Sequence, residues 1–183
     1  MSNQAELTVN GKTLKLPTMV GTENEVGIDV TALRSETGAI TLDPGFGNTG
    51  SCISKITYVD GENGVLRYRG YPIEELVEKS TFLEVAYLLL HGELPTPAQF
   101  EEFTGAIRRR AMLPEDVKRF FSSVFPDRAH PMSIAASTIS MLSTFYLDDR
   151  NPNDPAHFAI AAERLIAKLP TIAAYTYKHS KYQ

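Results

Sequence analysis

The feature that most constrains this chain is a series of helix start signals that begins at Pro72 and continues almost to its end. Pro72 suits the first turn of a helix, where a missing N–H costs no intrahelical bond. Thr81 and Glu84 have the spacing of a capping box, and the apolar run after them ends at Gly92. Pro170 is predicted to break the last helix. Five to seven helices are therefore expected, and their other start signals are Thr96-Pro97 with Gln99, Pro114, His130-Pro131 and Asp154-Pro155.

The chain before Pro72 carries strand and turn signals instead. Two short alternating runs flank Asn10-Gly11, a dipeptide typical of type I′ hairpin turns. A second hairpin is predicted around residues 60–64, and between the two hairpins we expect one short helix that ends at Gly38. The predicted fold class is mainly α. A small β-rich region is expected over residues 1–70, followed by a helical part over residues 71–183.

Charge and cysteine content argue against several classes of protein. The formal net charge is −4, so no excess of Lys and Arg exists to neutralise nucleic-acid phosphates. The single cysteine, Cys52, has no partner for an intrachain disulfide, which fits a reducing compartment. Neither a signal-peptide pattern nor an apolar run of about 18 residues occurs. We therefore expect a cytoplasmic protein with neither a nucleic-acid nor a membrane partner.

The histidines and the glycine-rich stretch give no evidence of a cofactor. No pair of histidines has metal-ligand spacing, so no metal site is predicted. His91 and His130 are expected to cap or pack against helices, and His157 and His179 to be exposed. The stretch DPGFGNTG does not match GxGxxG or a phosphate-binding loop and is interpreted as an ordinary loop.

The last two helical segments are apolar on more than one face. Such a helix is expected to be buried on all sides. The chain reaches Gln183 directly after these segments, so we expect their faces to meet another subunit or a further part of the same protein. The residues concerned are Ile134, Ala135, Ile139, Met141, Leu142 and Phe145, then Ile160, Leu165, Ile166, Leu169, Ile172 and Tyr175.

Several blocks of the sequence resemble the N-terminal part of a citrate synthase of the hexameric bacterial type II. The resemblance runs from about Glu6 to the end, and the order of the blocks makes it more specific than any single one. It implies the helical bundle of that family's large domain. It also implies a structural corner at RGYPI, where Arg67 and Arg69 bond carbonyls or carboxylates. The matching blocks are LDPGF, SCISKITYVDGENGVLRYRGYPIEEL, FLEVAYLLLHGELPT, HPM and AKLPTIAAYTYKHS.

The resemblance implies a reaction whose catalytic residues this chain lacks. Citrate synthases join acetyl-CoA to oxaloacetate with an aspartate base, two histidines and several arginines from the second half of their chains. No position here matches those motifs, so this chain alone is predicted inactive, with no catalytic residues and no cofactor. A homodimer or hexamer is expected through 131–146 and 155–180. Two alternatives remain: a non-catalytic dimerisation or nucleotide-binding regulatory module, and a methylcitrate synthase segment, which the β-rich leader disfavours.

A basic cluster is the one candidate binding site. The arginines at 108–110 end a predicted helix, where the helix dipole favours cations. Arg164 and Lys168 lie four apart, a like-charge pair that costs about 0.2–0.5 kcal/mol unless an anion lies between them. In the Gram-negative branch of the family NADH is an allosteric inhibitor, but Arg110 and Ala111 replace that branch's histidine and threonine. The effector that the resemblance implies is NADH or another anionic nucleotide. The implied residues are Arg109, Arg110, Met112, Tyr146, Arg164 and Lys168.

Overall fold

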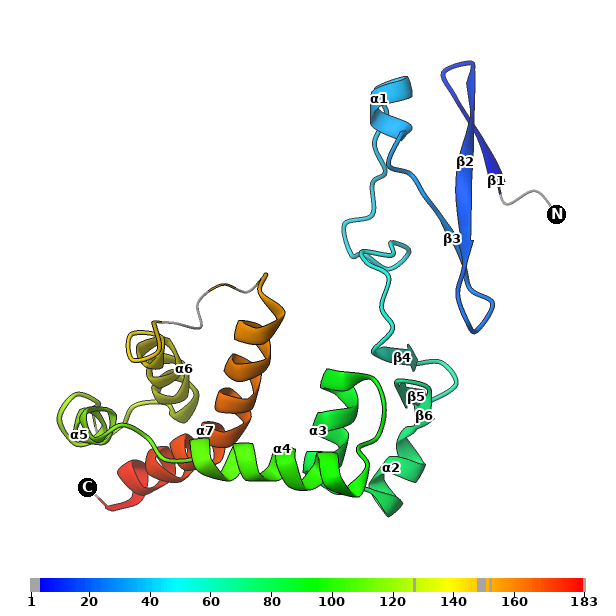
Figure 1. Ribbon diagram of the computed structural model, residues 1–183. Helices are drawn as coiled ribbons and strands as arrows, with labels where there is room; N and C mark the ends of the chain where they lie inside the picture. The colour runs from blue at the N-terminus through cyan, green and yellow to red at the C-terminus, as the bar shows by residue number, and fades with distance from the viewer. Residues whose placement is uncertain (1–3, 127, 148–150, 152, 183) are drawn as a thin grey trace. The chain divides into compact units, whose positions relative to one another are not determined.

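The computed structural model describes residues 4–126, 128–147, 151 and 153–182 (Figure 1). The chain divides into two compact units, residues 1–55 and 56–183. The first unit has a small core on one sheet, and the second has two clusters of buried apolar residues between helices. The predicted regions 1–70 and 71–183 separate the strands from the helices. The compact units divide the chain at another place, because the second hairpin belongs to the same unit as the helices.

The first unit is a twisted antiparallel sheet with one short helix. The turn between its first two strands has positive φ angles at Asn10 (51°) and Gly11 (79°), as a type I′ turn requires, so the predicted hairpin is confirmed. Leu14 and Leu16 are buried against Leu33 of the helix. The elements are β1 (Gln4–Val9), β2 (Lys12–Val20), β3 (Val26–Ile28) and α1 (Leu33–Thr37), with sheet order β1-β2-β3.

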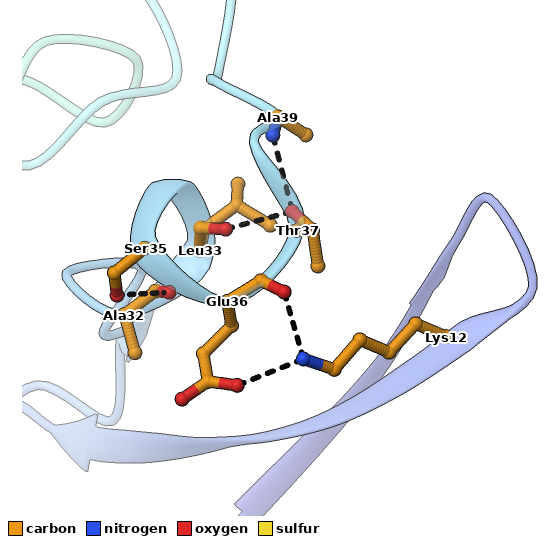
Figure 2. A network of polar contacts seen from close by, with 7 residues as sticks. All are labelled: Lys12, Ala32, Leu33, Ser35, Glu36, Thr37 and Ala39. Carbon is orange, nitrogen blue, oxygen red and sulfur yellow. Dashed lines mark hydrogen bonds and ion pairs between the residues drawn. The ribbon is translucent and has the colours of Figure 1, made fainter.

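A small polar network joins α1 to the first hairpin (Figure 2). The Lys12 ammonium donates to the Glu36 carboxylate at 2.9 Å and to the Glu36 carbonyl at 2.7 Å. The Thr37 hydroxyl donates to the Leu33 carbonyl at 2.7 Å, and Gly38 ends the helix at φ 74°, as predicted. Both charged side chains are about half exposed, 53% and 52%, so the ion pair contributes about 1 kcal/mol at most. The network orients α1 and is no candidate for chemistry.

The second unit begins with the predicted second hairpin. Its strands are β4 (Thr57–Asp60), β5 (Val65–Tyr68) and β6 (Tyr71–Pro72), in the order β4-β5-β6. The Asp60 carboxylate accepts from the side-chain amide and backbone N–H of Asn63, and these bonds hold the pKa of Asp60 below its usual range. The turn residues therefore fix the hairpin locally, which is why the sequence predicts it.

The helices of the second unit start where the sequence signals them. Capping boxes are present at Thr81 and Thr96, and the His130 ring nitrogen Nδ1 accepts from the Met132 N–H at 3.2 Å. Pro72 occupies the N-cap of its helix instead of the predicted first helical position. The mainly α fold is confirmed. The helices are α2 (Ile73–Lys79), α3 (Phe82–His91), α4 (Pro97–Arg110), α5 (Glu115–Ser123), α6 (Pro131–Leu142) and α7 (Pro155–Tyr182).

The predicted break at Pro170 is wrong, because α7 continues through this residue to Tyr182. A proline removes one backbone N–H and crowds the preceding turn, which bends a helix without ending it when packing holds both halves. Ala167, before the proline, packs on α4, and Ile172, after it, packs among α5 and α6. In Figure 1 the ribbon of α7 changes direction where its colour passes from orange to red.

Burial in the second unit covers only one side of its last helix. Ile134 and Ile172 are almost completely buried, at 0% and 1% exposed. Phe158 and Leu169, both on α7, remain 55% and 50% exposed. Within the described residues α7 is thus not buried all round, and several of its apolar side chains are about half exposed.

The capping box of α3 gives a first prediction. Thr81→Ala removes a hydroxyl that accepts from the Glu84 N–H, and it should lower the free energy of unfolding by about 1 kcal/mol. Thr81→Ser keeps the hydroxyl and serves as the control. Urea unfolding followed by circular dichroism measures both variants. Equal midpoints for the two would contradict the role given to the cap.

The same box predicts a pH dependence. The backbone N–H and hydroxyl of Thr81 both donate to the Glu84 carboxylate and hold the pKa of Glu84 below its usual 4.5. A carboxyl group with a lowered folded pKa contributes stability above its unfolded pKa, and this contribution disappears as the pH falls through the folded value. Glu84→Gln should flatten the loss of stability below pH 4.5, whereas Glu78→Gln, at an exposed position of α2, should not. Identical pH profiles of the urea midpoint for these two variants would refute this.

Candidate functional site

The candidate site lies where the end of α4 meets the middle of α7 (Figure 1). Three arginines close α4, and its C-cap residue, Ala111, has helical angles of φ −66° and ψ −32°. The helix thus lacks the left-handed glycine that commonly satisfies the last carbonyl groups. Those carbonyls need donors from elsewhere in the molecule.

Side chains of α7 supply these donors. The Lys168 ammonium donates to the Arg110 carbonyl at 2.7 Å and also to the Met112 carbonyl. The Thr171 hydroxyl donates to the Ala111 carbonyl at 3.1 Å. These bonds place the Lys168 charge at the negative end of the α4 dipole, where a cation is favoured. The Lys168 side chain is also buried, at 3% exposed.

The Tyr146 ring contacts two cations of α7, Arg164 and Lys168. The guanidinium carbon of Arg164 is 3.7 Å from the centre of the tyrosine ring, and the Lys168 ammonium is 5.6 Å from it. Both distances are within the range of cation–π attraction. The repulsion expected between Arg164 and Lys168 is therefore offset by the ring and, for Lys168, by the carbonyls of α4.

The structure gathers four of the six predicted residues. Arg110 joins the cluster through an ion pair with Glu163, whose Oε2 lies 3.1 Å from its Nη1. Arg109 is exposed and its Nη1 lies back along α4, close to Gly105. The Met112 side chain is 68% exposed, although its carbonyl accepts from Lys168. The gathered residues are Arg110, Tyr146, Arg164 and Lys168.

Sequence reasoning missed Glu163 and Thr171. Both contact α4 from a helix more than fifty residues further along the chain, since the Arg110–Glu163 and Ala111–Thr171 contacts span 53 and 60 positions. Neither residue belongs to a local motif. The only signal is their place on the same turns of α7 as Arg164 and Lys168.

Three of the four histidines cap or pack against helices, whereas His157, which was expected to be exposed, is half-buried. His91 stacks on Tyr87 with ring centres 4.1 Å apart, and His130 caps α6. His179 was expected to be exposed, but it is only 6% exposed, with Nε2 3.4 Å from the Pro126 carbonyl. The end of α7 packs on the connection between α5 and α6, which local sequence does not reveal. Among the residues that the structure describes, no group of three His, Cys, Asp or Glu could hold a metal ion, and no helix is long and apolar enough to cross a membrane.

The corner at RGYPI is structural, as predicted for Arg69. This arginine has a φ of 51°, and Gly70 follows it at 90°, so the chain turns sharply there. The Arg69 Nη2 donates to the Leu89 carbonyl at 2.7 Å, in the last turn of α3. Arg69 thus ties the strand end to the end of the next helix but one.

The family follows from comparison of sequences. The sequence model of the family "Citrate synthase, C-terminal domain" matches residues 45–183. Citrate synthase 1 of Mycobacterium tuberculosis is 50% identical over 176 residues, covering 96% of this chain and 41% of that protein. The citrate synthase of Corynebacterium glutamicum is 47% identical over 180 residues, covering 98% of this chain and 41% of that protein. The chain belongs to the citrate synthase family, and it spans about two fifths of the length of these relatives.

Solved structures agree with this assignment. The citrate synthase of Thermotoga maritima has a TM-score of 0.62 at 37% identity, over 77% of this chain and 36% of that one. The enzyme of Thermoplasma acidophilum, solved as a ternary complex with carboxymethyl coenzyme A and oxaloacetate, has a TM-score of 0.69 over 76% of this chain and 36% of that one. Its identity to this chain is 19%, so it supports the fold alone.

Proposed function

We propose that this chain forms part of the large domain of a cytoplasmic citrate synthase, which condenses acetyl-CoA with oxaloacetate to give citrate and CoA. The observation that supports this most strongly is 50% identity over 96% of the chain to a citrate synthase of which it spans 41%. The chain supplies the first helices of the bundle and does not catalyse the reaction alone.

The chemistry explains why activity should need more than these residues. Condensation requires a base for an α-proton of acetyl-CoA, a donor for the enolate oxygen and cations for two carboxylates. His91, His130 and His179 are engaged in stacking, capping and packing. By resemblance to the family, the catalytic groups come from the second half of a complete enzyme.

Release of the CoA thiol tests the proposal. The 183-residue chain mixed with acetyl-CoA and oxaloacetate should release no thiol above the blank, while the complete enzyme from the same source should release it. Turnover by the 183-residue chain alone would overturn the proposal. Propionyl-CoA in the same assay tests the methylcitrate alternative, which predicts a higher kcat/KM for propionyl-CoA than for acetyl-CoA.

The half-exposed side chains of α7 favour self-association. Phe158, Leu165 and Leu169 are 55%, 45% and 50% exposed, and an apolar surface of this kind commonly marks an interface. We expect a two-fold homodimer through 131–146 and 155–180, or a hexamer built from it. The competing class, a free-standing dimerisation or regulatory module, predicts that the 183-residue chain is a stable, soluble dimer by analytical ultracentrifugation. If the chain is instead a segment of a citrate synthase, it should aggregate when it is alone, and the rest of the enzyme should prevent this aggregation.

An anionic nucleotide is the effector proposed for the basic cluster. The support is the position of Arg164 and Lys168 at the ring of Tyr146, together with the resemblance to NADH-inhibited citrate synthases. Arg110 is next to them, because its carbonyl accepts from Lys168. Arg164→Ala in the complete enzyme should abolish inhibition by NADH and leave the KM for both substrates unchanged. Steady-state kinetics with and without NADH measure this, with Arg108→Ala, at an exposed position, as the control. Inhibition that persists in the Arg164 variant would remove this site from consideration.

A further inference from the structure

The segment that follows α1 carries an aromatic ring that the described residues leave exposed. Phe46 is 73% exposed, and its backbone φ of 51° lies in the left-handed region. Such a φ is an outlier for a bulky side chain, and a strained residue of this kind is often found at a functional site. The apolar side chains of Leu42 and Ile53 are also exposed, at 86% and 74%. The fold of the described residues gives the Phe46 ring no packing that offsets its strain.

The loop of residues 43–49 holds the ring in this position. The Asp43 carboxylate accepts from the backbone N–H of Gly47 at 3.2 Å and from that of Asn48 at 2.9 Å. The Thr49 hydroxyl also donates to it at 2.6 Å and does most to hold the pKa of Asp43 below its usual range. The loop is therefore organised before any partner arrives, so docking of its ring would cost little conformational entropy.

Two glycines flank the ring without an evident reason in the described residues. Neither Gly45 nor Gly47 has a left-handed φ, whereas Gly38, at the end of α1, has a φ of 74°. A Cβ added to Gly45 or Gly47 would have no atom within 4 Å beyond its chain neighbours. Glycine is also used where another surface approaches the backbone closely. A surface that covers Phe46 would account for both glycines.

The comparison with the family indicates what this surface is. The match to the citrate synthase model begins at residue 45, so the ring belongs to the part of the chain shared with the family, whereas β1, β2, β3 and α1 precede it. The relatives from Mycobacterium tuberculosis and Corynebacterium glutamicum are matched over 41% of their length, so more than half of each lies outside the match. A surface in the same chain would meet the ring at a high effective concentration.

We infer that Phe46 is an anchor residue whose ring docks into an apolar pocket on the second half of the complete enzyme. The bonds of Asp43 give the ring a rigid base, and Gly45 and Gly47 let the second half approach closely. Aromatic side chains that fill a partner's pocket commonly dominate the energy of an interface. This inference rests on the proposed function, because it requires a protein longer than these 183 residues.

Hydroxyl-radical footprinting of the complete native protein tests the docking without any substitution. A docked Phe46 should be oxidised about fivefold more slowly than in a free peptide of residues 40–53, whereas a ring that is 73% exposed should react at nearly the rate of the peptide. Rates close to those of the peptide, in a native protein heavier than 20.2 kDa, would overturn the anchor and leave the proposed function standing. Protection in a native protein of 20.2 kDa would overturn both, because a second copy would then cover the ring. Protection that disappears when the complete protein is diluted to single chains would also assign the ring to a second copy and overturn the inference.

Phe46→Asn in the complete protein tests the anchor by the sign of its effect. Asparagine tolerates a left-handed φ better than phenylalanine, so this change relieves strain and removes the ring. If the ring docks, the thermal midpoint should fall by about 5 °C. An unchanged or higher midpoint, which relief of strain alone predicts, would overturn the anchor. If the variant does not fold, the footprinting of the wild type decides.

Gly47→Ala tests the close approach in the same protein. Alanine fits this position in the described residues, so only a covering surface predicts a lower thermal midpoint. Gly61→Ala is the matched control, because Gly61 also lacks a left-handed φ and a neighbour within 4 Å, and it should leave the midpoint unchanged. Equal midpoints for the two variants would contradict the close approach.

Discussion

Phe121→Ala is expected to lower the free energy of unfolding of the helical unit by about 3–5 kcal/mol. Phe121 is 3% exposed and lies in the cluster that joins α5, α6 and α7. Its ring stacks on Tyr175 with centres 5.3 Å apart and packs at an angle on Phe125 at 5.9 Å. The substitution would leave a cavity among these packed rings, which can relax only partly to fill it.

A matched substitution separates burial from residue type. Phe82→Ala makes the same chemical change at a side chain that is 75% exposed at the start of α3, and it should shift stability by about 0.5 kcal/mol or less. Urea unfolding monitored by circular dichroism gives both values. Similar losses for the two variants would mean that the cluster around Phe121 does not hold α5 to α7.

Arg69→Met is expected to cost about 1.5–3 kcal/mol, the range for a hydrogen bond that involves a charged group. The Arg69 guanidinium donates to the Leu89 carbonyl at 2.7 Å and brings its positive charge to the C-terminal end of α3. Methionine keeps a comparable stem but leaves that carbonyl without its donor. The tight corner at Arg69 and Gly70 would then lose this link to α3.

Arg108→Met provides the control for this prediction. Arg108 is an exposed arginine in the last turn of α4, and its loss should change the unfolding midpoint little. Urea unfolding measures both variants, and hydrogen exchange at the end of α3 should quicken only in Arg69→Met. Unaltered exchange there would show that Arg69 does not tie the corner to α3.

The sequence predicted those parts of the fold that depend on neighbouring residues. The Asn10-Gly11 turn, the capping boxes of Thr81 and Thr96, and the left-handed glycine at the end of α3 act within a few positions. Pro170 was misjudged because packing on both of its sides keeps α7 continuous. Burial of His179 was missed for a similar reason, since its contact with Pro126 spans 53 positions.

The candidate site was predictable only in part. The resemblance supplied Arg110, Tyr146, Arg164 and Lys168, which the structure brings together. It did not supply the carbonyls that Lys168 bonds, because backbone acceptors leave no trace in residue identities. The resemblance implies Lys168 as a cation for a ligand. In the structure its ammonium donates to backbone carbonyls at the end of α4.

The intact mass of the protein as its source organism makes it is the most direct test of the proposal that this chain is part of a larger condensing enzyme. Mass spectrometry of the purified native protein should give a value well above 20.2 kDa, the mass of these 183 residues. A native protein of 20.2 kDa would contradict the proposal and would favour a free-standing module that binds partners through its helices.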